Sequence, residues 1–413
     1  MTNSSTGAFY GWYVVAATFV LLWMGFGAAY SFAVFFPSLR DEFDATRGDT
    51  SLVFGIAGFL YFGLGALTGP LADRIGPRPV VVAGVVLAGA GLILASRAQS
   101  LWQVYLTYSV GVGMGVGFIY VPAVGAIQRW FVRKRGSASG IAVSGIGVGT
   151  LVTPLVANFL IDQGGWRGAY LTLGIATLAV GLPAAFLLER SPAGRNLLPD
   201  GDAVGAQTST LATSLGFTLT EALRSRTFWL LYGATLTTGL GLFIPFVHLA
   251  PFAKDHGVSG GEATLLVGMI GLGSIVGRLA MGPAADRLGR KAALGTTFAV
   301  MAGAFCLWLV SSQYSLLVVF SVIFGAAYGG FVALIPALTA DYFGGRSVGA
   351  ILGVLYTGAA FGALVGPPFA GAVFDIRESY ALPIAFGAAM NCIAMACVIR
   401  LRPPSNARLK EST

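Results

Sequence analysis

Charged residues are scarce in this chain of 413 residues: only 10% are charged, whereas 56% are hydrophobic. A soluble domain carries about 25% charged residues, so the composition excludes an ordinary soluble protein and indicates one embedded in a membrane. Cysteine and histidine are also rare, with three and two residues. The three cysteines lie in apolar segments, which argues against a disulfide framework or a metal site. No Gly-x-x-x-x-Gly-Lys-Ser/Thr run occurs, so we expect neither nucleotide-driven pumping nor an enzyme with a bound cofactor.

Long apolar runs are what the chain has instead. A membrane-spanning helix needs about 20 apolar residues, and twelve such runs can be placed, which predicts an all-α polytopic membrane protein. The first run begins near Tyr10 and is too long for the apolar core of a cleaved signal peptide. The predicted spans are 10–38, 51–73, 79–97, 101–129, 137–161, 166–188, 226–253, 262–285, 291–311, 315–341, 346–373 and 379–401.

An internal repeat divides these spans into two sets of six. The charged turn around Asp73 recurs around Asp286, 213 residues later, and Pro154 and Pro367 share that spacing. We therefore expect a six-helix half over residues 1–188, a polar cytoplasmic linker over 189–225 and a second half over 226–413. Near Glu221 the linker could hold a short surface helix.

Lys and Arg predict the orientation of the chain. With both termini inside, 18 basic residues fall on the cytoplasmic side and six on the outer side, as the positive-inside rule requires. The bias accounts for the net charge of +8 without a nucleic-acid partner. We expect a multi-pass monomer in the plasma membrane with the lipid bilayer as its surroundings.

Twelve spans, the duplication and the turn Gly-x-x-x-Asp-Arg-x-Gly-x-Arg in both halves resemble the major facilitator superfamily. The resemblance implies two pseudo-symmetric six-helix halves that move by alternating access. The turns could also form a charged latch that holds one conformation closed, although topological anchoring explains their charges equally well. The candidate latch residues are Asp73, Arg74, Arg78, Asp286, Arg287 and Arg290.

Three further segments resemble monocarboxylate transporters, and in part bacterial oxalate/formate exchangers. They are Tyr10-Gly-Trp-Tyr-Val-Val15, Tyr30-Ser-Phe-Ala-Val-Phe-Phe36 and Gly277-Arg-Leu-Ala-Met-Gly282. The arginine of the last segment binds the substrate carboxylate in those families, which implies this role for Arg278. Eukaryotic relatives often carry an aspartate one turn earlier, where this chain has Ser274, and a lysine where it has Tyr30. Oxalate exchangers carry a second cation where this chain has Tyr356.

Arg278 is the main candidate site residue on physical grounds as well. An arginine inside a membrane span costs about 2.5–3.5 kcal/mol or more and indicates a function by default, although snorkelling to the surface is an alternative. Its counterpart at the repeat spacing is Gly65, so the cation belongs to one half only. A guanidinium matches a carboxylate with two parallel hydrogen bonds, which predicts an anionic substrate.

Polar and aromatic residues on the cavity helices of the family are further candidates for substrate binding. His248 could hydrogen-bond the substrate or titrate near neutral pH, or could simply be solvated. The others, for which ordinary packing competes as an explanation, are Tyr30, Tyr120, Tyr328, Tyr356, Phe331 and Phe361.

All 17 carboxylates can be placed in loops or at helix ends, so no buried acid offers itself as a proton carrier. Proton coupling would have to use His248, the region of Asp341 or the substrate itself. We expect a secondary transporter for small monocarboxylates such as L-lactate or pyruvate, in symport with protons. An oxalate/formate-type antiporter and a sensor that binds a carboxylate without moving it are the alternatives.

Overall fold

The computed structural model describes residues 9–131, 134–195, 197–201, 216–344 and 347–403. At residues 73, 135, 136, 282, 283 and 286 the structure describes the backbone but not the side chain. Within these ranges the chain is helical, with one isolated bridge between Gly216 and Gly344. The first half contains α1 (Gly11–Tyr30), α2 (Phe32–Glu42), α3 (Arg47–Gly63), α4 (Gly65–Ile75), α5 (Pro77–Ala95), α6 (Leu101–Val104), α7 (Gly111–Trp130) and α8 (Arg135–Phe186). The second contains α10 (Arg226–Leu242), α11 (Ile244–Asp255), α12 (Gly260–Leu288), α13 (Arg290–Val310), α14 (Tyr314–Phe343), α15 (Val348–Arg377) and α16 (Ala381–Ile399).

The number of membrane crossings agrees with the twelve predicted spans. Eleven segments of the described residues are long and apolar enough to cross a membrane, and one of them, within α8, is 50 residues long. This helix is broken at Gly164 and Gly165, where φ of Gly165 is 69°. A positive φ is adopted without strain by glycine, so the glycine pair lets the chain turn back, and α8 supplies two crossings.

The predicted duplication is visible in the helix boundaries. At the same spacing of 213 residues, α3 and α12 begin at Arg47 and Gly260, and α5 and α13 begin at Pro77 and Arg290. The ends of α2 and α11, of α7 and α14, and of α8 and α16 correspond in the same way. Interrupted spans also correspond, because α1 and α2 meet at Ser31, and α10 and α11 meet at Phe243.

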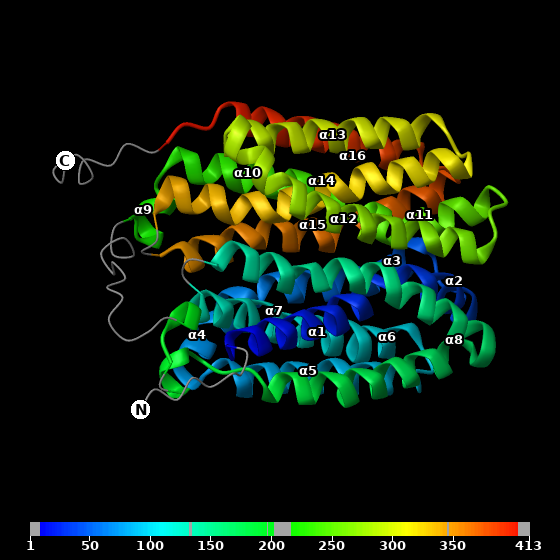
Figure 1. The fold of residues 1–413 in the computed structure, drawn as a ribbon. Coiled ribbons are helices and arrows are strands. Elements are labelled where there is room, and N and C mark those ends of the chain that lie inside the picture. The colour runs from blue at the N-terminus through cyan, green and yellow to red at the C-terminus, as the bar shows by residue number, and fades with distance from the viewer. Residues whose placement is uncertain (1–8, 132–133, 196, 202–215, 345–346, 404–413) are drawn as a thin grey trace.

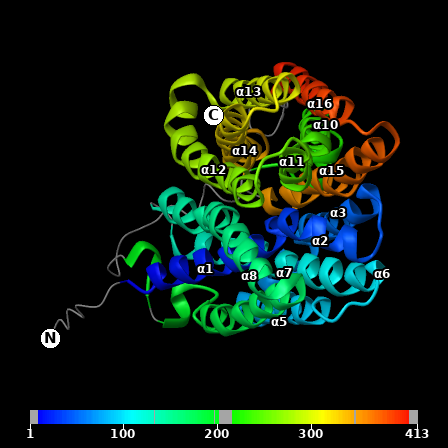
Figure 2. The same ribbon diagram turned by 90° about the vertical axis from the view of Figure 1, so that its right-hand side faces the viewer.

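The two halves lie side by side, with α1–α8 below and α10–α16 above in Figure 1 and again in the rotated view of Figure 2. We call the end where α1 begins and α16 ends the terminal end, and the opposite one the far end. Contacts between the halves are made mainly by α3 with α15 and by α8 with α12. The backbones approach closely there, since a Cβ on Gly271 of α12 would lie 2.7 Å from the Gly147 carbonyl oxygen of α8. Small residues permit such close packing between membrane helices.

A short helix lies near Glu221, where the sequence predicts one within the linker. It is α9 (Leu219–Leu223), which begins with a capping box between Thr218 and Glu221. Reciprocal hydrogen bonds of this kind satisfy two backbone N–H groups that a helix start leaves free. The box explains why a helix of only five residues forms at this point.

Candidate functional site

Arg278 lies inside the helix bundle, on α12, with 9% of its surface exposed. Its Nη1 donates a hydrogen bond to the carbonyl oxygen of Val143 on α8, at 3.2 Å. Nε and Nη2 are buried and have no partner among the described residues. A buried polar group without a partner costs about 1–3 kcal/mol, and more when it is charged. The guanidinium is therefore poised to accept a ligand that supplies the missing acceptors.

The four tyrosines that the sequence predicts gather around this cation. The hydroxyls of Tyr30 on α1 and Tyr328 on α14 are 3.1 Å apart and join the two halves. The ring centre of Tyr328 lies 5.8 Å from Cζ of Arg278. Tyr120 on α7 interacts electrostatically with Arg278, and its hydroxyl with that of Tyr356 on α15. Tyrosines from four helices, α1, α7, α14 and α15, thus surround one positive charge on α12 directly or through one another.

Two further hydroxyls at this site have no hydrogen-bond partner among the described residues. Tyr61 on α3 is 1% exposed, and its ring packs 5.7 Å from Phe26. Ser274 is fully buried one turn before Arg278 on α12. Sequence reasoning noted Ser274 only as a departure from relatives and missed Tyr61, because one tyrosine among 14 carries no signal of its own.

The arrangement suits a carboxylate. No ion pair involving Arg278 occurs in the part of the chain that the structure describes, so its charge lacks a counter-ion there. A carboxylate could accept from Nε and Nη2 together, which is the strong bidentate geometry of guanidinium–carboxylate pairs. Phenolic hydroxyls beside it could donate to the remaining lone pairs. The site can bind one anionic group and orient it.

His248 lies in a different network, at the interface of the halves on the far-end side. Its Nε2 is 2.9 Å from the carbonyl oxygen of Pro367 and 3.0 Å from Oγ of Ser51, while its Nδ1 is 2.9 Å from the hydroxyl of Tyr380. A carbonyl can only accept, so we assign the proton to Nε2 and let Nδ1 accept from Tyr380. His248 is fully buried and is not solvated.

Arg47 holds the far end of the halves together. From α3 it donates to the Tyr380 hydroxyl at 2.8 Å and to Asp255 of α11 at 2.9 Å. Its backbone N–H donates to Asp375 of α15 at 3.0 Å, and its guanidinium lies 3.9 Å from the ring centre of Phe374. Sequence analysis did not single out Arg47, because its partners are more than 200 residues away in the chain.

The two candidate phenylalanines do not join the tyrosine cluster in the contacts that the structure describes. Phe331 is 3% exposed and packs 5.7 Å from Phe298, within its own half. Phe361 is 45% exposed and contacts Phe59 across the seam between α15 and α3.

The described latch residues are held within their own halves at the terminal end. Arg78 donates to the Leu188 carbonyl at 3.0 Å, and Arg290 pairs with Asp341. Arg74 and Arg287 are exposed, and the side chains of Asp73 and Asp286 lie outside the described residues.

The chain matches the family model of the Major Facilitator Superfamily twice, over residues 18–252 and 231–413. Monocarboxylate transporter 11 of Mus musculus is 35% identical over 67% of this chain and 60% of its own length. Monocarboxylate transporter 3 of Rattus norvegicus is 33% identical over 78% of this chain, and 65% of its own length is covered. About a third or more of these two relatives is thus outside the match. Monocarboxylate transporter 12-B of Danio rerio is 31% identical over 84% of this chain and 77% of its own length.

A solved structure supports the same fold. The crystal structure of a bacterial homologue of the human lysosomal transporter Spinster, in an inward-facing and unoccupied conformation, is similar with a TM-score of 0.73. The alignment covers 96% of this chain and 99% of that one, at 19% identity.

Proposed function

Because the chain belongs to the major facilitator superfamily, in its monocarboxylate transporter family, we propose that it is a secondary transporter of small monocarboxylates such as L-lactate and pyruvate. The observation that carries the proposal is the buried guanidinium of Arg278, with two unpartnered nitrogens beside a cluster of tyrosines. A single fixed cation fits one carboxylate. Tyr30, Tyr61 and Tyr328 supply hydroxyls for the substrate's oxygen atoms.

Alternating access would open the site to each side in turn by movement of one half against the other. We place the termini in the cytoplasm, the far end outside and a monomer in the plasma membrane, with halves at residues 1–188 and 226–413 joined by a linker. The hydrogen bonds of Arg47, Tyr30 and His248 then close the outer side. We therefore propose that this state is closed to the outside.

Proton symport is the second part of the proposal, and His248 is its carrier. In the closed far end its Nδ1 accepts from Tyr380, whose hydroxyl accepts in turn from Arg47. A proton added to Nδ1 removes this acceptor and places a second positive charge beside Arg47. Protonation from outside therefore favours an opened far end, where an external anion can enter.

Counterflow in proteoliposomes tests the function. Vesicles loaded with unlabelled L-lactate should accumulate labelled L-lactate transiently, whereas vesicles with Arg278→Ala should not. Binding without counterflow would indicate a carboxylate sensor instead. Counterflow by oxalate and formate that exceeds that of lactate would indicate the antiporter alternative.

A further inference from the structure

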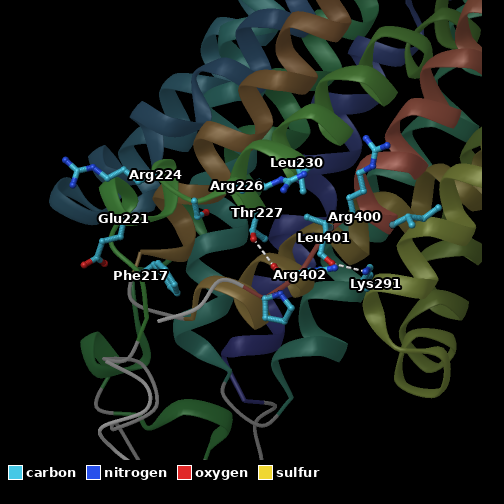
Figure 3. A pocket seen from close by; sticks show the side chains of 13 residues that line it. Phe217, Glu221, Arg224, Arg226, Thr227, Leu230, Lys291, Arg400, Leu401 and Arg402 are labelled. Carbon is cyan, nitrogen blue, oxygen red and sulfur yellow. Dashed lines mark hydrogen bonds between the residues drawn. The ribbon is translucent and has the colours of Figure 1, made fainter. Parts of the chain in front are cut away.

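A pocket of about 920 Å³ lies at the terminal end of the second half, away from Arg278. It is bounded by α9, the start of α10, the start of α13 and the chain that leaves α16 (Figure 3). Ligand sites typically measure about 300–1,000 Å³, so the pocket is large enough for a small molecule or a headgroup. Its charged lining residues are Arg224, Arg226, Lys291, Arg400, Arg402 and Glu221.

The lining is strongly unbalanced in charge, with five cations against one carboxylate. Glu221 is engaged in the capping box of α9, where it accepts from the Thr218 backbone N–H at 2.8 Å. Lys291 donates to the Leu401 carbonyl at 2.8 Å. No ion pair joins any of the five cations to a carboxylate among the described residues. Lys291 is thereby held beside the segment that carries Arg402, the residue after Leu401 (Figure 3).

The first half provides an internal control, because the repeat spacing gives every lining residue a counterpart. Lys291 corresponds to Arg78, which donates to the Leu188 carbonyl just as Lys291 donates to that of Leu401. Arg402, however, corresponds to Glu189, which pairs there with Arg78 at 3.5 Å and with Arg195 at 2.8 Å.

The remaining cations also lack charged counterparts. Arg224, Arg226 and Arg400 correspond to Gly11, Tyr13 and Leu187. Of the five cations, one is thus shared by the two halves and four are specific to the second half, whereas the first half has Arg190 where the second has Pro403. Orientation by the positive-inside rule does not require them to line one pocket.

The geometry points to a binding site for the headgroup of an anionic phospholipid. A phosphodiester supplies a negative charge for Arg400, Arg402 and Lys291, none of which forms an ion pair among the described residues. Basic pockets between membrane helices suit such headgroups. The surroundings favour a lipid over a soluble phosphate. Trp229 and Ile399 are 56% and 62% exposed beside the pocket, where acyl chains can cover them and where tryptophan favours the membrane interface.

The sharpest variant is Arg402→Glu, which reproduces the ion pair of the first half. A glutamate at this position can pair with Lys291 as Glu189 does with Arg78, so the fold should tolerate it while the pocket loses two of its four units of excess positive charge. Native mass spectrometry of purified protein with phosphatidylglycerol should give one saturable site in the unchanged protein. At about 1 kcal/mol for each unit of charge near a membrane surface, the two-unit change should weaken binding roughly thirtyfold.

Lys134→Glu is the matched control, since Lys134 is exposed at the same end of the first half and the change in charge is identical. It should leave phosphatidylglycerol binding within about twofold. An equal loss in both variants would overturn the proposal in favour of general surface charge. If Arg402→Glu does not fold, Arg400→Gln is the second variant, and its affinity for phosphatidylglycerol should fall roughly fivefold. Unchanged affinity in Arg400→Gln would also overturn the proposed site. Phosphatidylcholine should bind weakly. Equally tight binding of glycerol 3-phosphate would assign the pocket to a soluble phosphate ester instead.

Discussion

Arg278 is the residue on which substrate binding depends, because its charge is buried and two of its nitrogens are free of partners among the described residues. Lysine at this position keeps the charge but loses the planar fork. Losing one hydrogen bond to a charged group costs about 1.5–3 kcal/mol, so Arg278→Lys should lower lactate affinity roughly ten- to hundredfold. Binding by isothermal titration and uptake into proteoliposomes measure the loss.

Arg377→Lys is the control for this change, since Arg377 is exposed at the end of α15. It should bind and transport like the unchanged protein. Normal lactate uptake by Arg278→Lys would remove Arg278 from the substrate site.

The single cation also sets the charge of the substrate. A second carboxylate in this site would meet tyrosine hydroxyls instead of a counter-ion, and an uncompensated buried charge costs several kcal/mol. Pyruvate should therefore compete with labelled lactate, and oxalate should compete at least tenfold less well. Stronger competition by oxalate than by pyruvate would contradict a monoanion site.

At the scale of residues, a sequence points most clearly to those that are unusual for their environment. Arg278 was found because a charge inside a span is rare, and the superfamily's cavity helices then pointed to Tyr30, Tyr120, Tyr328 and Tyr356. Tyr61 was missed, since nothing in a single sequence separates a cavity tyrosine from a packing one. The position of Tyr61 at the site depends on tertiary packing, which brings its ring on α3 against Phe26 on α1. Sequence spacing does not express such a contact.

At the scale of elements, α3, α11 and α15 form a polar closure at the far end. Arg47 of α3 is 7% exposed and contacts Asp255 of α11, Asp375 of α15 and Tyr380, the residue before α16. Arg47→Gln removes charge-assisted hydrogen bonds worth about 1.5–3 kcal/mol, which should shift the equilibrium toward the open far end by roughly ten- to hundredfold. Distances between spin labels at the far ends of α3 and α15 would report this shift.

Arg40→Gln is the matched control, because Arg40 lies at the same end but pairs only with its neighbour Asp41 among the described residues. Its distance distribution should equal that of the unchanged protein. If Arg47→Gln left the distribution equally unchanged, the network would not act as a closure.

The elements themselves could be predicted almost completely from the sequence. Apolar runs of about 20 residues mark the spans because every backbone group inside a membrane must be paired within a helix. The internal repeat shows which span of the first half corresponds to which span of the second. The sequence did not predict the break between α3 and α4 at Leu64. It also did not predict the closure by Arg47, because that closure depends on contacts between the halves.

On the scale of the whole molecule, the cost of moving charge decides the coupling. Inward movement of a bare monoanion works against a negative-inside potential by about 2.3 kcal/mol per 100 mV. A co-transported proton removes that cost. Arginine side chains stay protonated in proteins, so the proton needs another carrier, and His248 links both halves through Ser51, Pro367 and Tyr380.

We therefore expect an inward-acid pH gradient to drive lactate accumulation, tested with the voltage clamped by potassium and valinomycin. His248→Ala should flatten the dependence on the gradient while lactate affinity changes by less than about threefold. The second histidine provides the control, because His256 is exposed and its side chain bonds, among the described residues, only to the Phe252 carbonyl one turn earlier. His256→Ala should therefore keep the full dependence. Accumulation that does not depend on the pH gradient but requires a counter-anion inside the vesicles would contradict this prediction. It would mean that the protein exchanges anions and does not carry a proton with each one.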